Sequence, residues 1–187
     1  MTILNGTSEI LLLIISGAGG SSDGYKGKYR TIAQNINSKY GASVVRTGLA
    51  VIGRAERVAH FAATMDAIGA EFGAHSIYIM ASSAAASLTA ANAYKYPNIK
   101  KLLLINPPAN INLHLQSNGL KRFNGKAIVL CGDHDPSFAY APMLTDGNNA
   151  ALITIANDDH KLSNMPLEEY IKLPEKYLFE DAKPVQI

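Results

Sequence analysis

Three groups of reactive residues follow apolar runs in this sequence. Ser82 and Ser83 follow one run, and two acid-histidine groups follow later ones, namely Asp133, His134 and Asp135, and Asp158, Asp159 and His160. A serine hydroxyl becomes an effective nucleophile when a base removes its proton, and imidazole titrates near neutral pH. A carboxylate can orient that imidazole. These residue types together point to nucleophilic catalysis by serine.

Ser83 is the candidate nucleophile because of its neighbours. The stretch Ala81-Ser82-Ser83-Ala84-Ala85 follows the pattern small-x-nucleophile-x-small, usually written G-x-S-x-G, in which the serine occupies a strained strand-to-helix turn. Placing the nucleophile at Ser83 puts alanine at both flanks, whereas Ser82 would put Met80 at one of them. The alternative interpretation is a serine N-cap followed by an alanine-rich core helix.

The elements that must position these residues are indicated by apolar periodicity. Apolar runs predict strands at 10–15, 43–46, 76–80, 101–105, 127–131 and 151–155, and helical periodicity predicts helices at 28–41, 55–73 and 84–95. Continuous apolar strands alternating with helices are typical of a parallel sheet covered on both faces. We therefore expect one α/β domain over 1–187, a three-layer α/β/α sandwich with a six-stranded, mostly parallel sheet. Ligand sites of such sheets lie beyond the carboxyl ends of the strands.

The chain order Ser83…Asp135…His160 is that of the α/β-hydrolases, and the sequence resembles this superfamily over nearly its whole length. "GDHDP" resembles the acid loop of the family, which implies Asp135 as the triad acid with Asp133 as the alternative. "NDDHKL" resembles the histidine loop, which implies His160. The resemblance implies a minimal α/β-hydrolase fold and a serine hydrolase that cleaves a carboxylic ester or thioester through an acyl-enzyme, with no cofactor or metal.

The glycine loop "SGAGGSS", at 16–22, resembles the loop that supplies half of the oxyanion hole in that family. The resemblance implies that the backbone N–H groups of Ala18 and Ala84 bind the oxyanion. Tyr25 and Phe138 follow the oxyanion and acid loops, which makes them candidates for the substrate pocket. The segment 106–125 has room for one crossover helix, so we expect no lid domain and an open site for a small ester or acyl substrate.

Three other interpretations stay open. The spacing Gly17-x-Gly19-x-x-Ser22 approaches a dinucleotide-binding loop, but serine stands in place of the third glycine, and the next strand ends "VVRTG" with no Asp or Glu after it until Glu56. Arg46 could accept a 2′-phosphate, which would suit NADP. The "DHD" and "DDH" stretches contain metal-ligand types. A catalytically inactive hydrolase-like binding protein is the third, because a fold does not determine function.

Composition excludes several other classes. The chain has 187 residues and a net charge of +2 without a long basic run, which gives no electrostatic case for nucleic acid or an anionic membrane surface. Cys131 is the one cysteine, so no disulfide framework is expected. The run at 10–15 is too short for a signal peptide and has no Lys or Arg before it, which favours a cytoplasmic location.

Overall fold

One sheet organises the molecule, a computed structural model that describes residues 1–49, 53–109, 112–147 and 149–185. Within these residues the strand order is β1-β3-β2-β4-β5-β6-β7. All pairs are parallel except β1–β3. The strands are β1 (Thr2–Leu4), β2 (Ile10–Ala18), β3 (Ser43–Leu49), β4 (Ser76–Ser82), β5 (Ile99–Ile105), β6 (Lys126–Gly132) and β7 (Ala150–Ile155).

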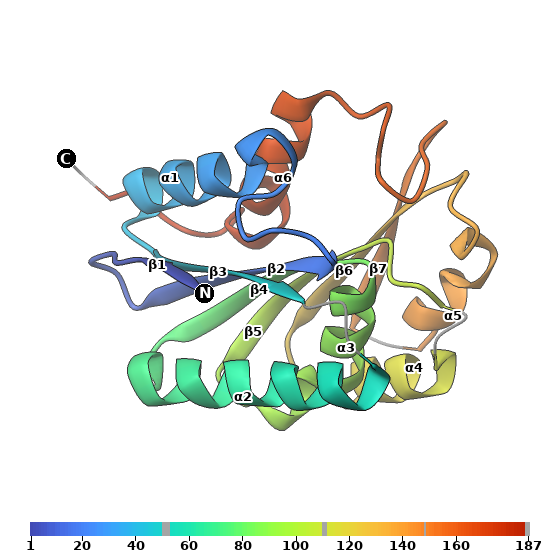
Figure 1. The fold of residues 1–187 in the computed structure, drawn as a ribbon, viewed down its shortest axis with the longest axis horizontal. Helices are drawn as coiled ribbons and strands as arrows, with labels where there is room; N and C mark the ends of the chain where they lie inside the picture. Colours follow the sequence, from blue (N-terminus) through green and yellow to red (C-terminus); the bar gives the residue numbers. More distant parts are fainter. Residues whose placement is uncertain (50–52, 110–111, 148, 186–187) are drawn as a thin grey trace.

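Helices cover both faces of this sheet, as Figure 1 shows. On one face lie α1 (Lys28–Tyr40) and α6 (Leu167–Leu178); on the other lie α2 (Arg54–Phe72), α3 (Ala84–Asn92) and α4 (Leu113–Arg122). Short helical turns complete the described chain, namely η1 (Tyr25–Gly27), η2 (Ala93–Lys95), η3 (Phe138–Tyr140) and α5 (Pro142–Thr145). The result is the predicted three-layer α/β/α arrangement.

The apolar strands explain the two layers of core. Leu11 and Leu13 of β2 pack in the cluster with Phe61 and Met65 of α2. The alternate residue Leu12 packs in the cluster on the α1 and α6 side. Successive side chains of a strand point to opposite faces, so a run that is apolar at every position covers both faces of the sheet.

The six-stranded prediction was wrong, because the described chain forms seven strands. The additional strand is β1, which pairs antiparallel with β3 through Thr2↔Arg46 and its neighbours. It has three residues and lies at the sheet edge, two of them exposed and one partly buried. Such a short edge strand lacks the apolar run from which the other strands were predicted.

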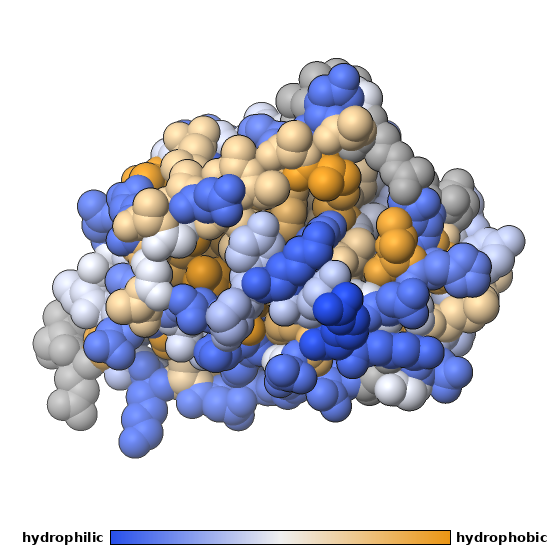
Figure 2. Space-filling model, turned by 90° about the horizontal axis from the view of Figure 1, so that it is seen from below, coloured by the Kyte–Doolittle hydropathy of each residue, from blue (hydrophilic) through white to orange (hydrophobic). Residues whose placement is uncertain are grey.

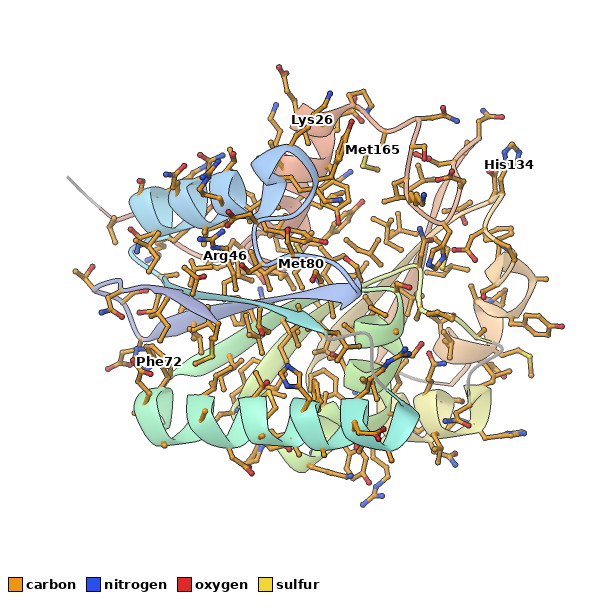
Figure 3. The ribbon with its side chains drawn as sticks, viewed as in Figure 1. Lys26, Arg46, Phe72, Met80, His134 and Met165 are labelled. Carbon is orange, nitrogen blue, oxygen red and sulfur yellow. The ribbon has the colours of Figure 1, made fainter. Side chains whose placement is uncertain are left out.

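Most predicted helices form close to their expected bounds. Helix α1 ends where Gly41 adopts φ +63° and donates its N–H to the carbonyl of Asn37, a left-handed cap that favours glycine. In α2, the helical spacing of Val58, Phe61, Met65, Ile68 and Phe72 predicts one apolar face. The last four are buried, with Phe72 at the end near the start of β4 in Figure 3, but Val58 is exposed. Between β5 and β6 the described residues contain one helix, α4, as expected for 106–125.

Helix α6 was not predicted, although it supplies part of the site described below. Its sequence contains Pro174, which removes a backbone donor and argues against a helix interior. Tyr170, Leu173 and Leu178 are nevertheless buried against the sheet. Tertiary packing of this apolar face outweighs the local cost of the proline.

The face of the molecule on the α2 side carries hydrophilic residues together with a broad area of hydrophobic ones (Figure 2). Among the described helices, none combines the length and apolar character needed to cross a membrane.

Candidate active site

Ser83 occupies a sharp turn between β4 and α3. Its backbone has φ +52° and ψ −128°, a strained conformation for a residue other than glycine. The turn is held because the Ser83 N–H donates to the Ile105 carbonyl (2.8 Å) and the Ser83 carbonyl accepts the N–H of Ser87 (3.1 Å). The flanking residues Ala81 and Ala85 are fully buried, so larger side chains would meet the strand and helix.

The Ser83 hydroxyl does not cap α3. Instead, Ser83 Oγ lies 2.9 Å from Nε2 of His160, which follows β7. On the other side of the imidazole ring, Nδ1 lies 2.5 Å from Oδ2 of Asp135, which follows β6. The three residues therefore form one hydrogen-bonded chain at the carboxyl edge of the sheet.

Asp135, and not Asp133, contacts the imidazole. The Asp135 side chain is 1% exposed, and its Oδ1 accepts the N–H of Ser137 (2.6 Å). Asp133 instead accepts the N–H of Asp158 at 3.3 Å. His134, on the outer edge of the molecule in Figure 3, has an exposed side chain 3.8 Å from Asp133.

Cys131 lies in β6 just before this acid loop. Burial and, to a smaller extent, the nearby negative charge of Asp135 raise the pKa of its thiol to about 12. The thiolate is the nucleophilic form of cysteine, so Cys131 is unsuited to act as a nucleophile at neutral pH.

Asn106 is a site residue that sequence reasoning missed. It is 1% exposed, follows β5 and has φ +45°. Its amide Nδ2 donates to the carbonyls of Asp159 (3.2 Å) and His160 (2.9 Å), and its Oδ1 accepts the N–H of Gly132 (3.0 Å). Asn106 thus ties the histidine loop to the end of β6. The sequence signal that could have identified Asn106 is its position as the first polar residue after the apolar run "LLLI" at 102–105, at the carboxyl end of a predicted strand.

The two other acids of the histidine loop shape its backbone. Buried Asp158 accepts the N–H groups of Asp159 and Asn164, each at 3.0 Å. Asp159 accepts hydrogen bonds from Ser163 and from the N–H of Lys161, and these bonds lower the pKa of its carboxyl. Both carboxylates therefore hold the turn that carries His160.

The glycine loop lies directly against the serine turn. A Cβ on Gly17 would lie 2.9 Å from the Cβ of Ser83, so a side chain there would displace the serine. Ala18 is the last residue of β2 and lines the same cavity as Ser83. Ala84 is the first residue of α3, where backbone N–H groups have no acceptor within the helix.

A cavity of about 610 Å³ opens beside Ser83 and His160. Of the two predicted pocket residues, Tyr25 lines it and is 73% exposed. Phe138 packs against the core on the α2 side and is not among the described residues that line the cavity.

Ser82 faces a separate group of hydroxyls. Its Oγ lies 3.1 Å from the hydroxyl of Tyr29 and 3.5 Å from that of Tyr170, and the two tyrosine hydroxyls are 3.4 Å apart. Both tyrosines are buried, one from α1 and one from α6. Burial raises the pKa of Tyr170 well above its usual range, so its hydroxyl stays protonated.

Arg46, the candidate for binding the 2′-phosphate of NADP, and the candidate metal ligands have other contacts in the structure. Arg46 lies between the sheet and the α1 layer (Figure 3), where its guanidinium pairs with Asp23 and donates to the Ser22 carbonyl. No three His, Cys, Asp or Glu side chains of the described ranges come together as a metal-binding group.

Comparison with solved structures places this fold. Est1E from Butyrivibrio proteoclasticus, in a structure with ferulic acid bound, matches with a TM-score of 0.75 at 16% identity, over 96% of this chain and 93% of that one. The monoacylglycerol lipase of Paleococcus ferrophilus matches with a TM-score of 0.72 at 12% identity, over 97% and 98%. XC6422 from Xanthomonas campestris, described as a lidless α/β serine hydrolase, matches with a TM-score of 0.64 at 15% identity, over 94% and 84%.

No protein-family model and no curated protein matches the sequence. The structural matches nevertheless cover most of this chain and of each neighbour, with TM-scores between 0.64 and 0.75, and one neighbour is described as an α/β serine hydrolase. The chain therefore has the α/β-hydrolase fold.

Proposed function

We propose that this chain is a serine hydrolase that cleaves carboxylic esters or thioesters through an acyl-enzyme. The observation that carries the proposal is the hydrogen-bonded chain from Ser83 Oγ through His160 to Asp135, with Ser83 on a strained strand-to-helix turn. A serine that only capped the helix would direct its hydroxyl to the helix backbone.

In the first half of the reaction, Ser83 Oγ attacks the carbonyl carbon while His160 Nε2 accepts the serine proton. The carboxylate of Asp135 accepts the Nδ1–H and stabilises the imidazolium. The N–H groups of Ala18 and Ala84 bind the tetrahedral oxyanion; loss of one such donor typically costs roughly 3–4 kcal/mol. His160 then protonates the departing alcohol or thiol as the C–O or C–S bond breaks.

In the second half, His160 removes a proton from water, which attacks the acyl group on Ser83. Collapse of the second tetrahedral intermediate releases the carboxylic acid and returns the proton to Ser83. The cycle consumes one ester and one water and produces one acid and one alcohol or thiol, without a cofactor.

The names of the similar structures support an ester as the bond that is cleaved, because they include an esterase domain from Rhodothermus marinus and a monoacylglycerol lipase. Est1E was solved with ferulic acid bound, so a feruloyl ester belongs in the first substrate panel beside simple aliphatic esters and thioesters. We infer a single domain without a lid, since the described residues between β5 and β6 contain only helix α4.

Labelling with a fluorophosphonate tests the mechanism. We expect covalent modification of the wild-type protein at Ser83, identified by mass spectrometry, and none in Ser83→Ala. Asp135→Asn should lower the labelling rate and kcat on the order of 10³- to 10⁴-fold, because the imidazole loses its orienting carboxylate. Ser38→Ala, at an exposed serine of α1, is the matched control and should label like the wild type.

Two results would contradict the proposal. One is a folded wild-type protein that resists labelling and hydrolyses no member of the panel, which would favour a hydrolase-like binding protein. The other is Ser83→Ala labelled as strongly as the wild type, which would place the nucleophile elsewhere.

A further inference from the structure

Lys28 is a half-buried cation in the cavity that contains Ser83 and His160. Its Nζ lies 3.5 Å from the ring centroid of Tyr170 and 5.3 Å from that of Tyr29. These two rings carry the hydroxyls that contact Ser82, the residue before the proposed nucleophile. The ammonium group is therefore held at the wall of the cavity, on the α1 and α6 side of the serine turn.

The protein supplies no carboxylate to this ammonium group within the described residues. The ion pairs found there involve other cations, such as Lys39 with Glu175 and Arg46 with Asp23. The described residues lining the cavity include Lys28 and Lys161 but no Asp or Glu. A charge removed from water without a partner is unfavourable, and burial accordingly lowers the pKa of Lys28 to about 8.

The position of Lys28 in its helix is also unfavourable for stability. It is the first residue of α1, and the first turn of that helix has no acidic residue. The partial positive charge of a helix N-terminus favours anions and disfavours cations there. An anionic group bound at Lys28 would give the ammonium group a charged partner and would also offset this repulsion.

The aromatic faces offer only part of that compensation. A cation over a tyrosine ring is attracted to the face of the ring, and it keeps N–H donors free to point elsewhere. The adjacent hydroxyls of Tyr29, Ser82 and Tyr170 are further groups able to donate hydrogen bonds to an acceptor. Together they make a polar, positively charged wall on the α1 and α6 side of the cavity.

We propose that Lys28 binds a carboxylate of the substrate, so that the preferred substrates are esters that carry a negative charge. The inference rests on the proposed hydrolase function and narrows its substrate class. The carboxylate can belong to the acyl group or to the leaving group, and the two sources are distinguished by experiment.

Matched substrates test the charge. For the acyl group, 4-nitrophenyl hydrogen adipate is compared with 4-nitrophenyl hexanoate, which has the same number of acyl carbons and no charge. For the leaving group, 3-carboxyphenyl hexanoate is compared with phenyl hexanoate. We expect wild-type kcat/KM to favour the anionic member of at least one pair after correction for spontaneous hydrolysis.

Substitutions at Lys28 test whether this residue causes the preference for the anionic ester. Lys28→Met should lower kcat/KM for the preferred anionic ester about tenfold or more, mainly through KM, because a charge-assisted hydrogen bond is lost. The neutral partner should change less than about twofold, and Lys28→Arg should retain most of the preference. The matched control is Lys26→Met, which removes an exposed charge that is not among the cavity-lining residues.

A binding measurement separates this proposal from the hydrolase mechanism. Adipate should raise the melting temperature of the wild type, compared with sodium chloride at equal ionic strength, and should not do so in Lys28→Met. Normal Ser83 labelling with no Lys28-dependent preference and no adipate effect would overturn the subsite alone. Failure of Ser83 labelling would overturn the hydrolase function, whereas the adipate result would still report on the subsite.

Discussion

Ser82 and Ser83 are neighbours in the chain with different surroundings. Ser82 contacts the hydroxyls of Tyr29 and Tyr170, from the helices on one face of the sheet. Ser83 contacts His160 at the carboxyl edge. The difference arises because β4 ends at Ser82 and the backbone then turns through the left-handed conformation of Ser83. Ser82, which belongs to the group of hydroxyls on the pocket wall, is thus directly followed by the proposed nucleophile, Ser83.

The pH dependence of substrate preference is a prediction for Lys28. The ratio of kcat/KM for the preferred anionic ester to that for its matched neutral ester should fall as pH rises through about 8. Burial lowers the Lys28 pKa to this value, so the ammonium group of the free enzyme is lost above it. Parallel pH profiles of the two esters, measured by release of the nitrophenolate or phenol leaving group, give the ratio directly.

Other titratable groups border the same cavity and must be separated from Lys28. They are Tyr25, Tyr29, Tyr170, His160 and Lys161. His160 acts on both esters in the proposed mechanism, so its contribution cancels in the ratio. In Lys28→Met the ratio should be low and independent of pH between 7 and 9. A wild-type ratio that does not change through pH 8 would contradict the assigned role of the Lys28 charge.

At the scale of elements, the carboxyl ends of β4, β5, β6 and β7 together carry the residues of the candidate site. Ser83 follows β4 and Asp135 follows β6, while His160 follows β7. Asn106, at the end of β5, connects them because it donates to the carbonyl of His160 and accepts the N–H of Gly132. The imidazole is thereby held by its backbone as well as by Asp135.

Asn106→Ala should lower kcat about tenfold or more with a smaller change in KM. The histidine loop loses two backbone contacts, so the imidazole is less often oriented toward Ser83. The unsatisfied carbonyls should also lower the free energy of unfolding by about 1–3 kcal/mol. Steady-state kinetics and thermal denaturation measure the two effects.

A double-mutant cycle shows whether Asn106 acts through His160. In a His160→Ala background, Asn106→Ala should produce little further loss of the residual rate, because the group that it positions is gone. Equal losses in both backgrounds would mean that Asn106 has only a general structural role.

At the scale of the whole molecule, the sheet is buried on both faces, and this makes its carboxyl edge a stable platform. Leu11 and Leu12 are adjacent, fully buried and assigned to opposite core clusters. A sheet with one solvent-exposed face would bury only one of them. At one border the sheet ends in β1, a short and mostly exposed strand.

Leu11→Ala and Leu12→Ala should each lower the free energy of unfolding by about 2–5 kcal/mol, because each leaves a cavity in a different layer. Leu115→Ala, at a leucine that is 54% exposed, is the control and should change it by less than about 0.5 kcal/mol. Urea denaturation measures the three values. A small effect at either Leu11 or Leu12 would contradict the two-layer core.

The sequence alone determined the α/β class, the parallel strands at 10–15 through 151–155 and the order of the reactive residues, because apolar periodicity and chain order are local properties. It missed β1, which is three residues long, and α6, whose apolar face is interrupted by Pro174. In both, contacts with distant parts of the chain outweigh local signals.

Only the tertiary structure decided which acid contacts His160, that Gly17 lies against Ser83, and that Lys28 and Asn106 belong to the site. Asp133 and Asp135 are equivalent in type and two residues apart, so composition cannot distinguish them. The choice depends on where the backbone turns after β6 and on which loops the sheet brings to the same edge. Those distances are set by folding of the whole chain, since Ser83 and His160 are 77 residues apart in sequence and 2.9 Å apart in space.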